Sequence, residues 1–96
     1  MLSKDTEEIL RILINLHKKT QSFELEGGYD LFSKGYQNGL SNIFEKLEQN
    51  GLIYNYTMFL DGGFILNLSP DALTYFENKE KAEKRNKYLR ILLFII

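Results

Sequence analysis

A chain of 96 residues with 44% hydrophobic and 14% aromatic side chains can bury one modest core, which excludes a disordered or low-complexity protein. The sequence contains no cysteine, and this excludes disulfides and thiolate metal sites. The net charge is −1: residues 1–69 carry nine carboxylates against six Lys and Arg, whereas residues 70–96 carry six Lys and Arg against four carboxylates.

The first predicted element is a helix from Asp5 to Lys19. Asp5 is expected to cap this helix, and Glu8 lies three residues later, as a capping box requires. The apolar residues at helical spacing are Ile9, Ile12, Leu13 and Leu16, with Leu10 and Ile14 widening the face. The N-terminal sequence Met1-Leu2-Ser3-Lys4-Asp5 becomes polar and acidic at once, unlike a signal peptide, so we expect a cytoplasmic protein.

Short elements follow in the middle of the chain. We expect a short strand between Thr20 and Gly28, where apolar and acidic residues alternate, and a short helix over Tyr29–Gly35. A second amphipathic helix is predicted over Leu40–Asn50. Its apolar stripe consists of Leu40, Ile43, Phe44 and Leu47, and we expect this stripe to pack against the first helix.

A β-hairpin and a long helix complete the predicted order. Residues 52–60 are predicted to form a strictly alternating strand, with the even-numbered side chains from Leu52 to Leu60 on one face. Asp61-Gly62-Gly63 favours a tight turn into a returning strand over residues 64–68. Ser69 is the predicted cap of the last helix and Pro70 its first residue. This helix runs through a polar middle into an apolar end.

Two stretches of the sequence carry a family resemblance. Leu47-Glu48-Gln49-Asn50-Gly51-Leu52-Ile53 resembles the exit from the recognition helix into the wing of small bacterial and phage winged-helix proteins. Residues 68–76 resemble the passage from the wing into the final helix of those proteins, although Ala72 stands where their pattern has Gly. The resemblance to these winged-helix proteins covers roughly residues 5–80, and proteins of the YjcQ type are similar in size and in the order of their elements.

The resemblance implies an α+β fold, a winged helix-turn-helix with about four helices, a two- or three-stranded antiparallel sheet and a long C-terminal helix. On this interpretation residues 1–76 form the winged-helix domain, and residues 77–96 form a C-terminal helix with a polar middle and an apolar end.

The sequence offers few groups for catalysis. His17 is the only histidine, and we expect it to be a surface or capping group at a helix end. No His, Asp and Glu residues have the spacing of metal ligands. Gly27-Gly28 and Gly62-Gly63 lack the pattern of a phosphate-binding loop. We therefore expect no enzyme activity, no metal and no cofactor.

The resemblance implies a DNA-binding homodimer that acts like a transcription regulator. The residues expected to read bases are Gln37, Asn38, Ser41, Asn42 and Lys46, and those expected to contact the phosphate backbone are Lys34, Lys18 and Lys19. The charge pattern opposes duplex binding, because Glu45 and Glu48 share the helix with these residues and residues 54–66 contain no Lys or Arg.

The alternative function is a winged-helix adaptor that binds a protein and no nucleic acid, either free or tethered to a membrane through a C-terminal segment. The aromatic residues that could form its surface are Tyr29, Tyr36, Tyr54, Tyr56, Phe59 and Phe64.

The apolar end of the chain, residues 88–96, has two interpretations. As a dimerisation helix, it would pair Leu89, Leu92, Leu93 and Ile96 across a two-fold axis. As the start of a membrane segment in a longer protein, it would have Lys79–Arg90 as its basic flank. Six apolar residues follow Arg90, far fewer than the ~20 of a spanning helix, so dimerisation is the favoured interpretation.

Overall fold

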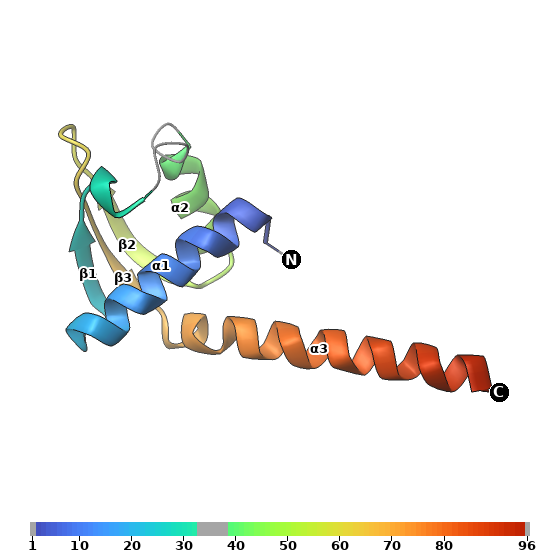
Figure 1. The fold of residues 1–96 in the computed structure, drawn as a ribbon. Helices are drawn as coiled ribbons and strands as arrows, with labels where there is room; N and C mark the ends of the chain where they lie inside the picture. Colours follow the sequence, from blue (N-terminus) through green and yellow to red (C-terminus); the bar gives the residue numbers. More distant parts are fainter. Residues whose placement is uncertain (1, 33–38, 96) are drawn as a thin grey trace.

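The computed structural model describes residues 2–32 and 39–95, with the backbone alone described for Tyr29 and beyond Arg85. Its elements in chain order are α1 (Lys4–Thr20), β1 (Glu24–Gly27), a 3₁₀ turn η1 (Tyr29–Leu31), α2 (Leu40–Gln49), β2 (Ile53–Met58), β3 (Phe64–Leu68) and α3 (Pro70–Ile95). The strands form an antiparallel sheet in the order β1-β3-β2, and α1 and α2 pack against one face of it (Figure 1). The fold is therefore α+β, as predicted.

The number of helices differs from the prediction of about four. The described residues contain three α-helices, and the helix expected over Tyr29–Gly35 is a 3₁₀ turn over Tyr29–Leu31. The rest of that expected helix, from residue 33, lies outside the described residues.

The N-terminal cap of α1 is Ser3, so the prediction of Asp5 as the cap was wrong. Ser3 has an extended backbone, and its Oγ accepts a hydrogen bond of 3.3 Å from the amide of Thr6. The Thr6 hydroxyl takes the position in the first turn where a capping box has Glu, and it lies 2.8 Å from Ser3 Oγ. Both Ser and Asp are good caps, and local sequence alone does not choose between two that are so close together.

The core forms where α1 and α2 meet the sheet. Leu40, Phe44 and Leu47 of α2 are completely buried, which confirms the predicted inward stripe, with Ile43 half-buried at its edge. The buried face of α1 is rotated from the prediction. Its buried apolar residues are Ile9, Leu10, Leu13 and Ile14, and its half-buried ones are Ile12 and Leu16.

Phe44 is the centre of an aromatic cluster that joins α2 to the sheet and to the segment after η1. Its ring centroid lies 5.3 Å from that of Phe64, 5.9 Å from that of Tyr56 and 6.3 Å from that of Phe32. The three neighbours come from β3, β2 and the residue after η1, so one side chain contacts three separate parts of the chain.

A β-bulge in β2 overturns the predicted strict alternation. Tyr54 pairs with Asn67 and Thr57 with Ile65, so that Asn55 and Tyr56 together face the single residue Leu66. Asn55 adopts φ +53°, a left-handed conformation that Asn tolerates better than most residues. The extra residue reverses the facing of the strand: Tyr54 is exposed, whereas Tyr56 and Met58 pack against the core.

The hairpin turn has the predicted position. The Phe59 amide donates to the Gly63 carbonyl at 2.8 Å, and Asp61 Oδ1 accepts from the Gly63 amide at 2.9 Å. Gly62 has φ +91°, which glycine adopts without steric cost.

Helix α3 begins as predicted and then leaves the body of the domain. Ser69 Oγ accepts from the Asp71 amide at 3.3 Å, and Pro70 is the first helical residue. Ala72 is buried and Tyr75 and Phe76 are half-buried, but residues 80–85 are all exposed. The helix continues through the predicted boundary at residue 76 and projects away from the other elements (Figure 1). Within the described residues, no helix combines the length and the hydropathy needed to cross a membrane.

Candidate interaction surface

The outer face of α2 carries the part of the predicted DNA-reading set that the structure describes. Ser41, Asn42 and Lys46 are all exposed there. Asn42 and Lys46, four residues apart, line one side of a hollow of about 240 Å³, and Ser3, Asp5 and Thr6 of the α1 N-terminus line the other. The remaining predicted residues Lys34, Gln37 and Asn38 lie outside the described residues.

The charge of this surface is negative. The charged residues of α2 and of the hairpin from Ile53 to Leu68 are Glu45, Lys46, Glu48 and Asp61, three carboxylates and one cation. The carboxylate of Asp5 also lines the hollow beside Lys46. A phosphate backbone approaching α2 would therefore meet more repulsion than attraction.

The two other predicted backbone contacts are not beside α2. Lys18 and Lys19 are exposed in the last turn of α1, whereas α2 meets the first turn of that helix. At 1.5 Å per residue, the length of α1 puts these lysines roughly 20 Å from the α2 hollow. The fold does not bring the predicted phosphate-contacting residues Lys18 and Lys19 together with the predicted base-reading residues.

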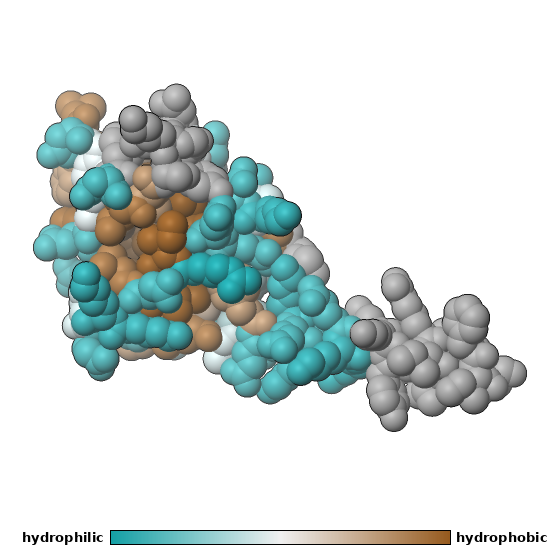
Figure 2. Space-filling model, in the orientation of Figure 1, coloured by the Kyte–Doolittle hydropathy of each residue, from teal (hydrophilic) through white to brown (hydrophobic). Residues whose placement is uncertain are grey.

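The tip of the hairpin is apolar and exposed. We define the hairpin tip as Phe59 and Leu60, which precede the turn. The Phe59 side chain is 48% exposed and that of Leu60 is completely exposed. Figure 2 shows hydrophobic atoms where the hairpin protrudes at the upper left of the molecule. The sequence indicates this exposure indirectly, since apolar residues next to a tight turn lie beyond the end of the sheet.

The other aromatic residues considered for a protein-binding surface are divided between core and surface. Phe64 is buried and Tyr56 half-buried against Phe44, whereas Tyr54 is 47% exposed on β2. Tyr36 and the side chain of Tyr29 are outside the described part of the chain.

A polar cluster that the sequence did not indicate joins α1 to α3. Lys79 Nζ lies 2.8 Å from both carboxylate oxygens of Glu7, and the Tyr75 hydroxyl donates to Glu7 Oε2 at 2.8 Å. The amide of Leu2 donates to the same hydroxyl at 3.3 Å. Glu7 is buried although it lies in the first turn of a helix, because its carboxylate has these two donors.

The ionisation of the cluster follows from its hydrogen bonds. Donation from Lys79 lowers the pKa of the Glu7 carboxyl, a lowering that burial opposes and the hydrogen bond from Tyr75 reinforces. The same hydrogen bond to Glu7 raises the pKa of Lys79. Burial raises the pKa of the Tyr75 hydroxyl, and its hydrogen bond to Glu7 adds to the effect. Glu7 and Lys79 are therefore charged and Tyr75 neutral at neutral pH.

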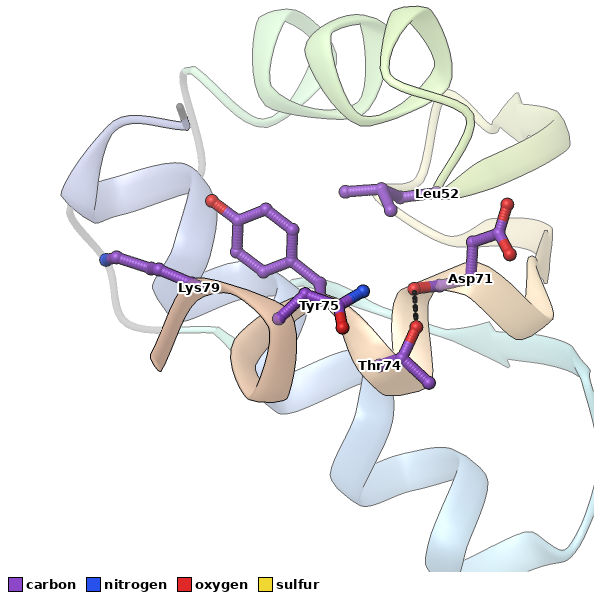
Figure 3. Close-up of a pocket in the computed structure, with 6 residues that line it drawn as sticks. Leu52, Asp71, Thr74, Tyr75 and Lys79 are labelled. Atoms are coloured by element: carbon purple, nitrogen blue, oxygen red, sulfur yellow. Dashed lines mark hydrogen bonds between the residues drawn. The ribbon is translucent and has the colours of Figure 1, made fainter. Parts of the chain in front are cut away.

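A groove of about 500 Å³ borders this cluster between α3 and the start of β2 (Figure 3). The side chains that line it are Leu52, Asp71, Thr74, Tyr75, Asn78 and Lys79. Three of its polar side chains form hydrogen bonds: the Thr74 hydroxyl donates to the Asp71 backbone carbonyl at 3.1 Å, and Tyr75 and Lys79 donate to Glu7.

His17 has a structural position. Its Nδ1 lies 2.8 Å from the Ser22 carbonyl oxygen, and its ring centroid lies 4.4 Å from that of Phe23. These contacts hold the turn between α1 and β1. Among residues 2–32 and 39–95, no group of three or more His, Cys, Asp or Glu could hold a metal ion.

Three of the four residues predicted for dimerisation, Leu89, Leu92 and Leu93, belong to the projecting part of α3. Ile96 lies outside the described residues.

Comparison with known protein families, with curated proteins and with solved structures finds no match to this chain.

Proposed function

We propose that this chain is a winged-helix module that binds a protein partner through its hairpin tip. Two features support the winged-helix assignment. Helix α2 is followed directly by the β2–β3 hairpin, and the N-terminal strand β1 adds to β3 to give the order β1-β3-β2. In this assignment α2 corresponds to the recognition helix and the hairpin to the wing.

The observation that carries the choice of partner is the exposure of Phe59 and Leu60 at the hairpin tip. Burying an apolar side chain of this size contributes roughly 1.5–3 kcal/mol. Two such side chains on a protruding turn can supply the central contacts of a protein interface, where a few large residues dominate the binding energy.

Charge favours a protein partner over duplex DNA. Lys46 is the one cation of α2 and the hairpin, and three carboxylates accompany it. Each phosphate that a cation contacts makes the slope of log affinity against log salt steeper by about 0.9. DNA-binding proteins with strong salt dependence make roughly 6–10 such contacts. Among the described residues, α2 and the hairpin offer one cation, far fewer than that requirement, whereas an apolar tip needs none.

The test of a protein partner is affinity capture from a lysate of the cells that express the chain, with quantification by mass spectrometry. In the double variant Phe59→Ser, Leu60→Ser, we expect the recovery of at least one captured protein to fall about tenfold or more. The reason is that truncating a central contact typically costs about 1–2 kcal/mol or more of binding free energy. Leu73→Ser on α3 is the matched control, since Leu73 is also a surface leucine at 37% exposure. If the natural chain, the double variant and the Leu73→Ser control all captured the same proteins in equal amounts, the hairpin tip would be excluded as the docking surface.

DNA binding through α2 is the second candidate function, and the exposed Ser41, Asn42 and Lys46 favour it. Hydroxyl, amide and ammonium groups on one helix face can donate to base edges in the major groove. If Lys46 of α2 contacts a base edge, Lys46→Gln should weaken binding and relax the sequence preference at that base. Lys81→Gln, which removes an exposed cation from α3, is the control. Absence of binding to random duplex at ~50 mM salt, where non-specific binding is strong, would eliminate this candidate.

A further inference from the structure

The projecting part of α3 changes its chemistry along its length. Residues 77–83 mix two lysines with three glutamates, and the ion pairs Glu77–Lys81 at 3.2 Å and Glu80–Lys84 at 3.3 Å run along the exposed helix. Residues 84–90 contain Lys84, Arg85, Lys87 and Arg90 and no carboxylate. Residues 91–95 are all apolar.

The apolar end is not suited to pairing with one other helix. Because 3.6 residues make one turn, five successive apolar residues surround the whole circumference of an α-helix. A two-helix interface covers only a stripe, and it would leave Ile91, Phe94 and Ile95 facing water in the predicted arrangement. A helix that is apolar all round instead requires apolar surroundings on every side.

The four cations of residues 84–90, which we call the cationic band, indicate what surrounds the apolar end. These four cations of residues 84–90 precede the apolar segment with no carboxylate between them, although Lys84 also pairs with Glu80, and they match the negative headgroups of an anionic membrane surface. Tyr88 lies within this cationic stretch, and tyrosine is enriched at the interface between headgroups and hydrocarbon. Residues 91–95, which follow the last of these cations, measure about 7.5 Å at 1.5 Å each in a helix, and this length fits within the roughly 15 Å hydrocarbon depth of one leaflet.

We propose that the end of α3 inserts into one leaflet of an anionic membrane, with Lys84, Arg85, Lys87 and Arg90 at the headgroups. The polar residues 77–83 then form a stalk that holds the acidic domain away from the surface (Figure 1). The proposal stands independently of the partner bound by the hairpin tip.

The first test is flotation of the full chain with phosphatidylcholine vesicles, with and without phosphatidylglycerol. We expect the chain to float with the anionic vesicles and to be released as salt rises, because salt screens the headgroup attraction. Leu92→Glu should weaken binding at least about tenfold, since a charge within hydrocarbon is costly. Leu60→Glu makes the same change at the fully exposed hairpin tip and should leave binding unchanged.

A second pair of variants distinguishes the effect of the cations in residues 84–90 from the effect of the net charge of the chain. Lys84→Gln combined with Arg85→Gln should reduce the preference for anionic vesicles. Lys18→Gln combined with Lys19→Gln removes the same charge from the exposed end of α1 and should not reduce it.

Depth of insertion can be measured directly because the sequence contains no tryptophan. Phe94→Trp should be quenched by lipids brominated on the acyl chains, whereas Phe59→Trp at the hairpin tip should not be.

Three outcomes would overturn the proposal. The first is flotation that Leu92→Glu leaves intact. The second is flotation lost with Leu60→Glu instead, which would make the hairpin tip the membrane contact. The third is failure to float with any vesicle; if sedimentation then detects a dimer that Leu92→Glu dissociates, a second copy of the chain covers the apolar end.

Discussion

Replacing Phe44 with alanine should destabilise the domain by about 3–5 kcal/mol, a large part of the 5–15 kcal/mol that holds a typical small domain folded. Phe44 is completely buried, and its ring contacts those of Phe32, Tyr56 and Phe64. Alanine would leave a cavity between α2 and the sheet that none of these neighbours can fill without moving its own element.

The expected loss corresponds to a fall in Tm of about 20 °C in a chain of this size, measurable by circular dichroism. Phe59→Ala is the matched control, because Phe59 is half exposed at the hairpin tip. That change should alter the free energy of unfolding by no more than about 0.5 kcal/mol. If the two variants melted at the same temperature, Phe44 would not be the centre of the core.

Acid should destabilise the domain through Glu7. The pKa of this carboxyl is lowered in the folded protein by Lys79, with a further contribution from Tyr75. A group with a lowered folded pKa stabilises the protein at every pH above its ordinary value of 4.5. That contribution is lost as the pH falls through the lower, folded pKa. The free energy of unfolding should therefore decrease below about pH 4.5.

Denaturant unfolding of Glu7→Gln across this pH range tests the prediction. The variant should be less stable than the natural protein at neutral pH, and it should lose less stability on acidification because the titrating carboxyl is gone. Glu77→Gln is the control, since the Glu77–Lys81 pair is exposed and worth little. A Glu7→Gln protein with the same acid dependence as the natural chain would show that other carboxylates cause the effect.

Lys79 of the same cluster should make the domain less stable at alkaline pH, because its pKa shift has the opposite direction to that of Glu7. Its pKa is raised in the folded protein, so its contribution is complete below its ordinary value of 10.5 and is lost as the pH rises through the folded pKa.

The sequence by itself determined the features that depend on neighbouring residues. Leu40, Phe44 and Leu47 recur at the period of a helix, and they form the buried face of α2. Asp61-Gly62 marked the hairpin turn, and Ser69-Pro70 marked the start of α3, because turn and cap preferences act within a few residues.

Only the tertiary structure decided features that depend on distant partners. Glu7 forms hydrogen bonds with Tyr75 and Lys79, which lie 68 and 72 residues away in the sequence, and no local pattern predicts these contacts. The bulge at Asn55 depends on how β2 aligns with β3, and a register of one extra residue turned Tyr56 inward while Tyr54 stayed outside. Periodicity and turn chemistry are local properties of the chain, whereas burial, register and ion pairing arise when separate elements pack together.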